Sequence, residues 1–147
     1  IVESGRYLAS LKAKRGESTR LGTFDFLGFT FYCGRTTKGN PWIMPKTSSK
    51  KFRQKVKEIK IWLYNNKEQK LGKLMYMLNI KLVGHYRYYG ISFNSRMISN
   101  YKQQARELLY KVLNRRSEKK SYTREGFIEM MKYYKLVNPK IYYSLFC

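Results

Sequence analysis

The hydrophobic residues change their spacing at Pro45, and this change constrains the fold more than any other feature of the sequence. Before Pro45, aromatic and β-branched residues crowd the stretch TFDFLGFTFYC, a composition typical of β-strands. After Pro45, apolar residues recur every three or four positions, which is the spacing of one face of an α-helix. The fold class is therefore predicted to be mainly α, with a small β-hairpin followed by a helical bundle.

The β-hairpin is expected over roughly 23–45, after a connector over residues 1–22. Both faces of the TFDFLGFTFYC strand are largely apolar, as in a strand that is buried on both sides. Gly28 marks a bulge or a close approach of another backbone within that strand. The letters GNP supply turn residues, and WIM after them supplies a short returning strand. Residues 1–45 form the first predicted unit.

Residues 46–147 form the second predicted unit, a bundle of three long helices and a shorter fourth. The first helix is predicted over about 49–66, and the second contains Asn79 as a candidate break. Gly84 and Gly90 are expected to bracket an aromatic turn before the third helix, where the backbone turns sharply. The predicted N-cap of the first helix is Thr47, Ser48 or Ser49, that of the third is Asn94 or Ser95, and that of the fourth is Thr123. Pro139 is expected to end the fourth helix. The apolar positions that define the helices are Phe52, Val56, Ile59 and Leu63; Leu71, Leu74, Met75, Leu78 and Leu82; Ile98, Tyr101, Ala105, Leu108 and Val112; and Phe127, Met131 and Tyr134.

The charge of the chain points to a polyanionic partner. Lys and Arg number 31 against 9 Asp and Glu, which gives a formal net charge of +22. Such an imbalance destabilises a compact state by self-repulsion, and ordinary solvated helix faces mix both signs. Because the chain is 43% hydrophobic, it is too apolar for a disordered basic tail. Nucleic acid is the leading partner, and an anionic membrane surface comes second.

The sequence carries no sign of membrane insertion or secretion. No apolar run approaches the roughly 18 residues that span a bilayer, and no signal peptide opens the chain. Cys33 and Cys147 fit neither a disulfide framework nor a zinc site, which favours a reducing, intracellular setting. Ile1 is not an initiator methionine, so the chain is expected to begin within a longer protein.

No catalytic or metal-binding set of residues is expected in this chain, and no cofactor. Asp25 is the only aspartate, whereas two-metal phosphoryl transfer needs at least two converging carboxylates. The remaining carboxylates fall on polar helix faces or in the connector, so Asp25 is interpreted as a structural residue bonded to local backbone or to an Arg. His85 is the only histidine and is interpreted as a packed or hydrogen-bonded residue, with a nucleic-acid contact as the alternative.

Four stretches resemble the C-terminal half of a group II intron reverse transcriptase, also called a maturase. TFDFLGFTFYCGRTTKGN resembles the strand and turn that end the polymerase palm of that family. LNIKLVGHYRYYGI resembles its LN-x-KL-x-G-x-Y-x-YYG signature in the thumb region. LLYKVLNRRSEKKSYTREGF and the later PKIYYSLF resemble the end of the thumb, with its basic LNRRS turn and Pro-Lys-Ile-x-x-Ser-Leu tail. The four stretches keep the family's order and cover roughly 23–146.

The resemblance implies that residues 1–45 are the end of the palm and residues 46–147 a helical thumb/maturase domain. The parent enzyme would be an RNA-directed DNA polymerase acting in reverse transcription, splicing and retrotransposition. Its fingers and palm would lie upstream in the same protein, with a Tyr-Ala-Asp-Asp type motif that binds Mg²⁺. That motif is absent here, so the chain alone is expected to be inactive. The implied setting is a bacterial cytoplasm, near the nucleoid, or an organelle.

The implied partners are the group II intron RNA and the template–primer. The resemblance implies RNA contacts in the Gly84–Gly90 stretch and in the basic run after residue 114. The other predicted RNA contacts are cations on the polar faces of the predicted helices. The tyrosines of the Gly84–Gly90 stretch would stack on bases or belong in part to the core. The predicted contacts are Lys50, Lys51, Arg53, Lys55, His85, Tyr86, Arg87, Tyr89, Arg96, Lys102, Arg106, Arg115, Arg116, Lys119 and Lys120.

Two alternatives remain open from the sequence. One is a free-standing, non-enzymatic RNA-binding helical protein, and the other is the thumb of a domesticated or CRISPR-associated reverse transcriptase. A Tyr/Phe-x-Asp-Asp motif encoded upstream of Ile1 would favour a polymerase, whereas a start codon near Ile1 would exclude one. A flanking intron RNA would separate the maturase from its domesticated relatives.

Overall fold

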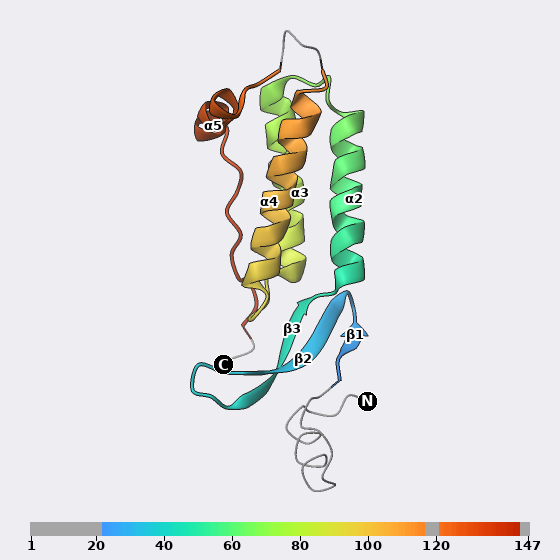
Figure 1. The fold of residues 1–147 in the computed structure, drawn as a ribbon, viewed down its shortest axis with the longest axis vertical. Helices are drawn as coiled ribbons and strands as arrows, with labels where there is room; N and C mark the ends of the chain where they lie inside the picture. Colours follow the sequence, from blue (N-terminus) through green and yellow to red (C-terminus); the bar gives the residue numbers. More distant parts are fainter. Residues whose placement is uncertain (1–21, 117–120, 145–147) are drawn as a thin grey trace, which may run out of the picture.

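The computed structural model describes residues 22–116 and 121–144 of the chain. Within these residues, three antiparallel strands are followed by four α-helices, which confirms the predicted fold class (Figure 1). The strands are β1 (Phe24–Phe26), β2 (Phe29–Arg35) and β3 (Pro41–Thr47), and the helices are α2 (Ser49–Asn65), α3 (Leu71–Tyr89), α4 (Ser95–Leu113) and α5 (Arg124–Tyr133). Most of the predicted connector, residues 1–21, lies outside the described residues.

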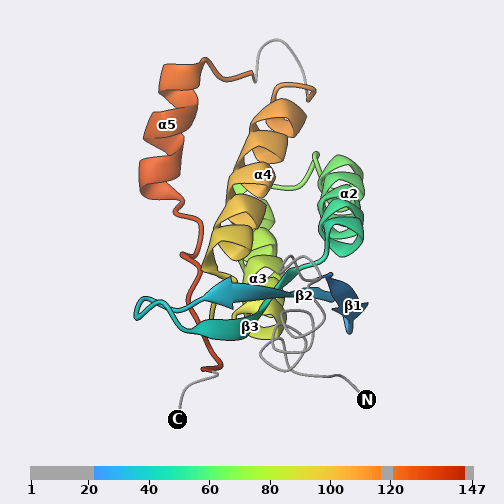
Figure 2. The same cartoon turned by 60° about the horizontal axis from the view of Figure 1, so that its bottom comes forward.

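The three long helices stand side by side, with the sheet across one end of the bundle (Figures 1 and 2). Helix α4 packs against both α2 and α3. The short helix α5 lies beside the far end of α4, and the chain after it runs back along the bundle towards the sheet. Both α2 and α3 thus rest on a common third helix, which leaves room for a groove between them.

The predicted hairpin over 23–45 is in fact a three-stranded sheet in the order β1-β2-β3, and β3 extends to Thr47. The expected single strand in TFDFLGFTFYC is wrong, because the chain reverses at Leu27 and Gly28. Both residues have positive φ, 53° and 85°, as a two-residue hairpin turn requires. Phe26 and Leu27 are exposed at 57% and 67%, so this strand is not buried on both faces.

Asp25 lies opposite Thr30 in the β1–β2 register. The Thr30 hydroxyl donates a hydrogen bond to Asp25 Oδ1 across the two strands. The partner is a neighbouring hydroxyl rather than the backbone group or Arg that was expected. Among the described residues, no cluster of acidic, His or Cys side chains could hold a metal ion around Asp25 or elsewhere.

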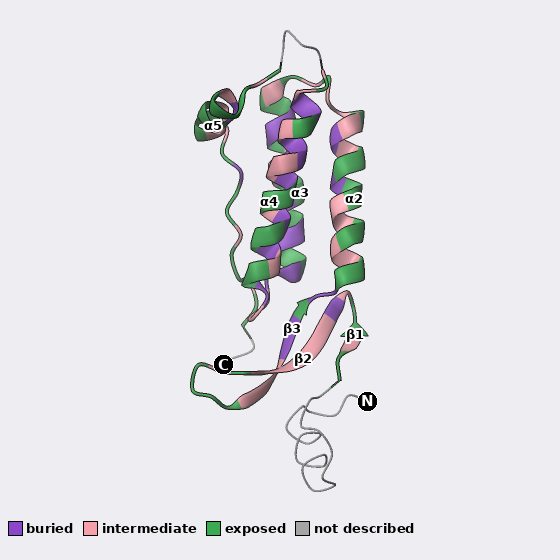
Figure 3. Ribbon diagram, viewed as in Figure 1, coloured by how far each residue is buried: buried purple, intermediate pink, exposed green. Residues whose placement is uncertain are grey.

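The core of the bundle follows the apolar stripes predicted from the spacing (Figure 3). Purple, buried residues run along the inner sides of α3 and α4. On α2 only the Ile59 and Leu63 end of the stripe is fully buried, whereas Phe52 and Val56 are partly exposed. Fully enclosed side chains in this core are Leu63, Leu74, Leu78, Leu82, Tyr86, Ala105, Leu109, Val112 and Leu113.

Helix α3 is continuous from Leu71 to Tyr89, so the predicted break at Asn79 and the aromatic turn beginning at Gly84 are wrong. Asn79 keeps its helical conformation and uses its side chain in tertiary bonds instead. Its Nδ2 donates to Lys135 O at 3.0 Å, and its Oδ1 accepts from Val137 N at 2.9 Å. The helix therefore carries the whole Gly84–Tyr89 stretch within its last two turns.

The segment after α5 is held along the bundle by hydrogen bonds to α3 and α4. Tyr86 Oη donates to Val137 O at 2.9 Å, and Lys102 Nζ donates to Asn138 Oδ1 at 2.6 Å. Gly90 O accepts from the backbone N–H groups of residues 142 and 143, at 2.7 and 3.0 Å. A Cβ at Gly90 would lie 2.3 Å from Tyr86 O and 2.6 Å from Lys140 O. Gly90 is thus fixed by a close backbone approach, and its φ of −79° lies outside the left-handed region.

Two of the predicted N-caps are formed. Ser48 accepts a hydrogen bond from Lys51 N at 3.1 Å, and Thr123 accepts one from Gly126 N at 3.0 Å. Asn94 occupies the N-cap position of α4, but its side chain makes no capping bond. It is completely buried and bridges β3 to the end of α3: Oδ1 accepts from Thr47 N at 2.8 Å, and Nδ2 donates to Tyr89 O at 2.8 Å.

No helix in the described part of the chain is both long enough and apolar enough to cross a bilayer.

Candidate nucleic-acid interface

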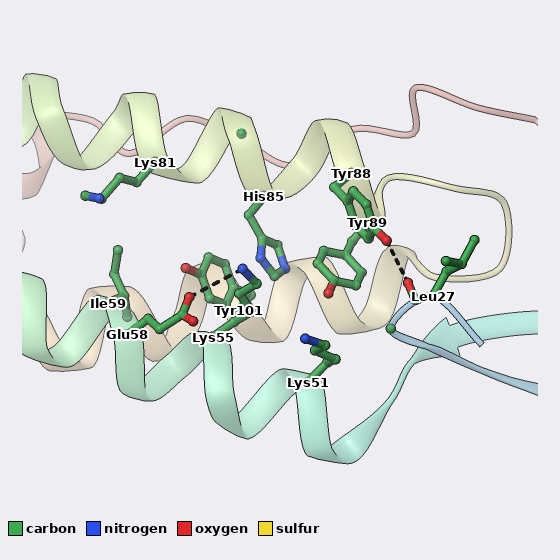
Figure 4. A pocket seen from close by; sticks show the side chains of 12 residues that line it. Leu27, Lys51, Lys55, Glu58, Ile59, Lys81, His85, Tyr88, Tyr89 and Tyr101 are labelled. Atoms are coloured by element: carbon green, nitrogen blue, oxygen red, sulfur yellow. Dashed lines mark hydrogen bonds and ion pairs between the residues drawn. The ribbon is translucent and has the colours of Figure 1, made fainter. Parts of the chain in front are cut away.

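A groove of about 760 Å³ opens between α2 and α3 at the end of the bundle next to the sheet (Figure 4). Helix α4 contributes a tyrosine to its lining, and the β1–β2 turn closes one end. Three lysines and several aromatic rings line it, together with one carboxylate. The lining residues are Leu27, Gly28, Lys51, Lys55, Glu58, Ile59, Lys81, Gly84, His85, Tyr88, Tyr89 and Tyr101.

His85 points from α3 into this groove. Its ring stacks on Tyr101 with centroids 3.6 Å apart and on Tyr89 at 4.6 Å. Burial first, and the positive charge of Lys55 second, lower the pKa of His85 to about 3. The imidazole is therefore neutral at physiological pH. Its Nε2 is buried and has no hydrogen-bond partner among the described residues.

The two tyrosines that sandwich His85 are also held in their neutral form. Burial raises the pKa of Tyr101 to about 12, with a smaller contribution from Glu58. Burial likewise raises the pKa of Tyr89. The floor of the groove is therefore uncharged and aromatic, and its charge lies on the rim.

The rim carries more positive than negative charge. Lys55 Nζ lies 3.3 Å from Glu58 Oε2, so one lysine is already paired. Neither Lys51 nor Lys81 forms an ion pair with a described carboxylate. The Lys81 ammonium lies 4.9 Å from the ring centroid of Trp62, a contact that keeps its charge near the surface.

The turn at the end of the groove is fixed by contacts from α3. Tyr88 Oη donates to Leu27 O at 2.7 Å, and the Tyr88 ring stacks on Phe29 with centroids 5.9 Å apart. A Cβ at Gly28 would lie 2.9 Å from Tyr89 Oη, so the predicted close approach at this glycine is made by a side chain. Leu27 and Tyr88 are nevertheless 67% and 53% exposed, which leaves an apolar surface at the mouth of the groove.

A second row of cations lies on the exposed outer side of α2. Lys50, Arg53, Lys57 and Lys60 are all exposed and recur at helical spacing along one face. Helix α2 carries one carboxylate, Glu58, which is the one paired with Lys55. The charged residues in this outer row, from Lys50 to Lys60, are therefore all cations.

A further hollow, of about 480 Å³, lies between the distal halves of α2 and α4. Three cations and two tyrosines line it, without a carboxylate among the described lining residues. The Arg115 guanidinium lies 5.7 Å from the ring centroid of Tyr64. The residues are Lys60, Tyr64, Leu108, Tyr110, Lys111, Asn114 and Arg115.

The carboxylate of α4 is also neutralised within the protein. Glu107 receives two hydrogen bonds from Arg124 of α5, at 3.1 and 2.9 Å. This bond, together with nearby positive charges, lowers the pKa of Glu107. Both carboxylates of the three long helices, Glu58 and Glu107, are thus engaged in ion pairs, which leaves most cations of these helices without a described carboxylate partner.

The structure brings part of the predicted contact set together and separates the rest. Lys51, Lys55, His85 and Tyr89 meet in the groove, and Lys50 and Arg53 lie on the outer row beside it. The exposed Arg96 and the partly buried Arg106 lie on α4, Arg115 lines the distal hollow, and Arg116 is partly buried. Lys119 and Lys120 lie outside the described residues.

Three predicted contacts have other surroundings. The Tyr86 side chain is completely enclosed and its hydroxyl donates to Val137 O, so in this structure it offers no surface to RNA. Lys102 binds Asn138, and the Arg87 guanidinium lies 5.9 Å from the ring centroid of Tyr142. The last two cations are thus directed towards the segment after α5.

The predicted set omitted several cations that the structure places at these surfaces. Lys81 was missed, although it precedes His85 by four residues and so shares its helix face. Lys57 and Lys60 belong to the same outer row as Arg53. Lys111 could not be placed from spacing alone, because its partners in the distal hollow come from α2.

Comparison with protein-family models, with curated proteins and with solved structures found no match to this chain.

Proposed function

We propose that this chain is the RNA-binding thumb/maturase part of a group II intron reverse transcriptase. In that role it grips the template–primer and the intron RNA, while the parent polymerase supplies catalysis and Mg²⁺ from an upstream palm. The observation that carries the proposal is the unbalanced charge of the long helices. Helix α2 has six Lys or Arg against Glu58, α3 has three against none, and α4 has four against Glu107.

Charge of this kind matches a phosphate backbone. Both carboxylates of the long helices are paired internally, so the charge that remains unpaired on these helices is positive. Lys and Arg neutralise phosphates and release condensed counterions, which supplies most of the affinity in binding that tolerates many sequences. An extended cationic helix face next to an aromatic groove suits RNA, since stacking and phosphate contacts can act together.

The placement of the family-like stretches also supports the proposal. The stretch TFDFLGFTFYC forms β1 and β2, whose turn accepts a hydrogen bond from Tyr88 in LNIKLVGHYRYYGI. The start of IYYSLF binds the carbonyl of Gly90 at the end of that same signature. Three of the four stretches thus meet at one end of the bundle, although they are far apart in the sequence.

The test is RNA binding by the 147-residue chain as a function of salt. A fluorescent RNA hairpin and an RNA–DNA template–primer should both bind, with log K falling linearly against log salt. If six or more phosphates are neutralised, affinity should fall by about three orders of magnitude between roughly 50 and 200 mM salt. Absence of binding to either probe at the lower salt concentration would contradict the proposal, as would binding to anionic vesicles in preference to RNA.

The assignment to a polymerase has a separate test. The gene upstream of Ile1 should encode fingers and palm with a Tyr/Phe-x-Asp-Asp motif. A start codon close to Ile1 would leave RNA binding intact but would make this a free-standing RNA-binding protein. The purified chain should incorporate no nucleotides with Mg²⁺, template and primer, because it holds a single aspartate.

A further inference from the structure

The groove between α2 and α3 contains a polar atom that phosphate binding alone leaves unexplained. His85 is 7% exposed, and its Nε2 finds no partner among the described protein groups. A buried polar atom without a hydrogen bond costs free energy, and such atoms are uncommon in folded proteins. Because the ring points into the groove, a ligand that enters there and displaces the side chains covering this atom can satisfy it.

We propose that this groove binds one unpaired nucleotide of an RNA strand, with its phosphate near Lys51 and its base edge at His85. The proposal rests on the RNA-binding function above and adds a place where a single nucleotide leaves the helical stack. It assigns two roles to α2: the outer row contacts backbone phosphates, and the inner side, with α3, holds one base.

The size of the groove fits this occupant. Its volume of about 760 Å³ lies within the range of roughly 300–1,000 Å³ that is usual for small-ligand sites. The groove is bounded by α2, α3 and the β1–β2 turn, so an intact duplex has no room to enter it. A single nucleotide that is extruded from a strand has room to enter the groove.

The chemistry of the lining also matches the parts of a nucleotide. Lys51 is a cation without a described carboxylate partner, as a phosphate requires. Leu27 and the Tyr88 ring expose apolar surface at the mouth, against which the face of a base can pack. His85 presents one hydrogen-bonding atom between these two regions.

The neutral state of His85 bears on the kind of contact it makes. Burial and Lys55 lower the pKa of His85 to about 3, so at physiological pH it is not a phosphate-binding cation. A neutral imidazole offers one donor and one acceptor nitrogen, and either tautomer can pair with a base edge or a ribose hydroxyl. The contact at Nε2 is therefore directed and uncharged, which distinguishes it from the contacts of the outer row.

The experiment compares two oligonucleotides of equal length and charge. One is a fluorescent oligouridylate, and the other has the same ribose–phosphate backbone without bases. The wild-type chain should bind the base-bearing strand about tenfold more tightly at the same salt concentration, because one stacked and hydrogen-bonded base contributes on that scale. The salt slopes of the two strands should be equal, since their phosphates are equal in number.

Variants locate the effect in the groove. His85→Phe keeps an aromatic ring between Tyr89 and Tyr101 and should reduce the preference to about twofold or less. Lys51→Ala should weaken binding of the base-bearing strand more than binding of the abasic strand. Lys57→Ala, a matched change on the outer side of the same helix, should weaken both strands by the same factor.

The outcomes separate this proposal from the broader one. Equal binding of both strands by the wild type would overturn the nucleotide site while leaving RNA binding in place. No binding of either strand at low salt would overturn both. A preference that survives in a His85→Phe variant with an unchanged melting temperature would also contradict the site. Saturable binding of free uridine monophosphate, lost in His85→Phe, would show that the groove accepts a nucleotide without a strand.

Discussion

The imidazole of His85 is packed between the rings of Tyr89 and Tyr101, within the field of the Lys55 ammonium. Burial is the larger cause and Lys55 the smaller one, and together they lower its pKa from 6.5 to about 3. The unfolded chain therefore binds a proton more readily than the folded chain between these two pH values. The stabilisation is fully present above pH 6.5 and is lost as pH falls from 6.5 towards 3.

This linkage predicts a pH-dependent stability that a single substitution should remove. Between pH 7 and pH 5 the wild-type chain should lose about 2 kcal/mol of unfolding free energy through His85. His85→Phe cannot be protonated at this position, so its stability should change far less over the same interval. Urea unfolding at the two pH values measures both. An equal loss in the two proteins would mean that His85 is hydrated and titrates normally in the folded state.

Two glycines in the C-terminal part of α3 and just after it have opposite surroundings. Gly84 lies inside the helix, and a Cβ there would meet nothing within 4 Å. Gly90 follows the last helical residue, and a Cβ there would lie 2.3 Å from Tyr86 O and 2.6 Å from Lys140 O. Both contacts involve backbone atoms, which cannot move aside as the end of a side chain can.

The two glycines should therefore respond in opposite directions to the same substitution. Gly84→Ala should stabilise the chain by about 0.5–1 kcal/mol, because alanine loses less backbone freedom in a helix. Gly90→Ala should destabilise it by about 1–3 kcal/mol, because the segment after α5 must separate from α3. Thermal or urea unfolding of the two variants side by side checks both signs. Stabilisation by Gly90→Ala would show that the segment is not docked as described.

The helices could be predicted because a buried stripe is a local, periodic property of the sequence. Ile98, Ala105 and Val112 recur at helical spacing, and all three are buried in α4. The prediction of a break at Asn79 and a turn at Gly84 was wrong because tertiary packing overrides the preference of these two residue types for non-helical backbone. Asn79 is satisfied by bonds to a segment 56 and 58 residues away, which no local pattern encodes.

The β1–β2 turn could not be predicted for a related reason. Leu27 has φ of 53°, and a left-handed residue other than glycine costs about 1–2 kcal/mol. The contact that helps to hold this turn comes from the Tyr88 hydroxyl, 61 residues later. A strand that continues through Leu27 and Gly28 has the same local composition, so the distant tyrosine helps to decide between the two.

At the scale of the whole molecule, the lining of the groove could be predicted from the sequence only in part. Lys81, His85 and Tyr89 follow one another at intervals of four residues, so their common helix face was open to prediction. That Lys51 faces them depends on how α2 and α3 both pack on α4. Charge could be counted from the sequence, but its division into an inner groove and an outer row required the fold.

The outer row gives a prediction that involves the whole charge distribution. Arg53 and Lys57 are exposed on α2 and make no ion pair with a described carboxylate. Lys132 on α5 is also exposed, but its Nζ lies 2.9 Å from Glu129 Oε1. If phosphates lie along α2, Arg53→Ala and Lys57→Ala should each lower the slope of log K against log salt by roughly one unit. Lys132→Ala should leave it unchanged.

Stability measurements separate this charge effect from loss of the fold. All three variants remove exposed side chains, so their unfolding free energies should stay within about 0.5 kcal/mol of the wild type. Ile59→Ala is the packing control, because Ile59 is buried on α2 and its truncation should cost about 2–5 kcal/mol. Its salt slope should remain that of the wild type at temperatures where it is folded. An unchanged slope in both α2 variants, with a reduced slope in Lys132→Ala, would place the RNA on α5 instead of α2.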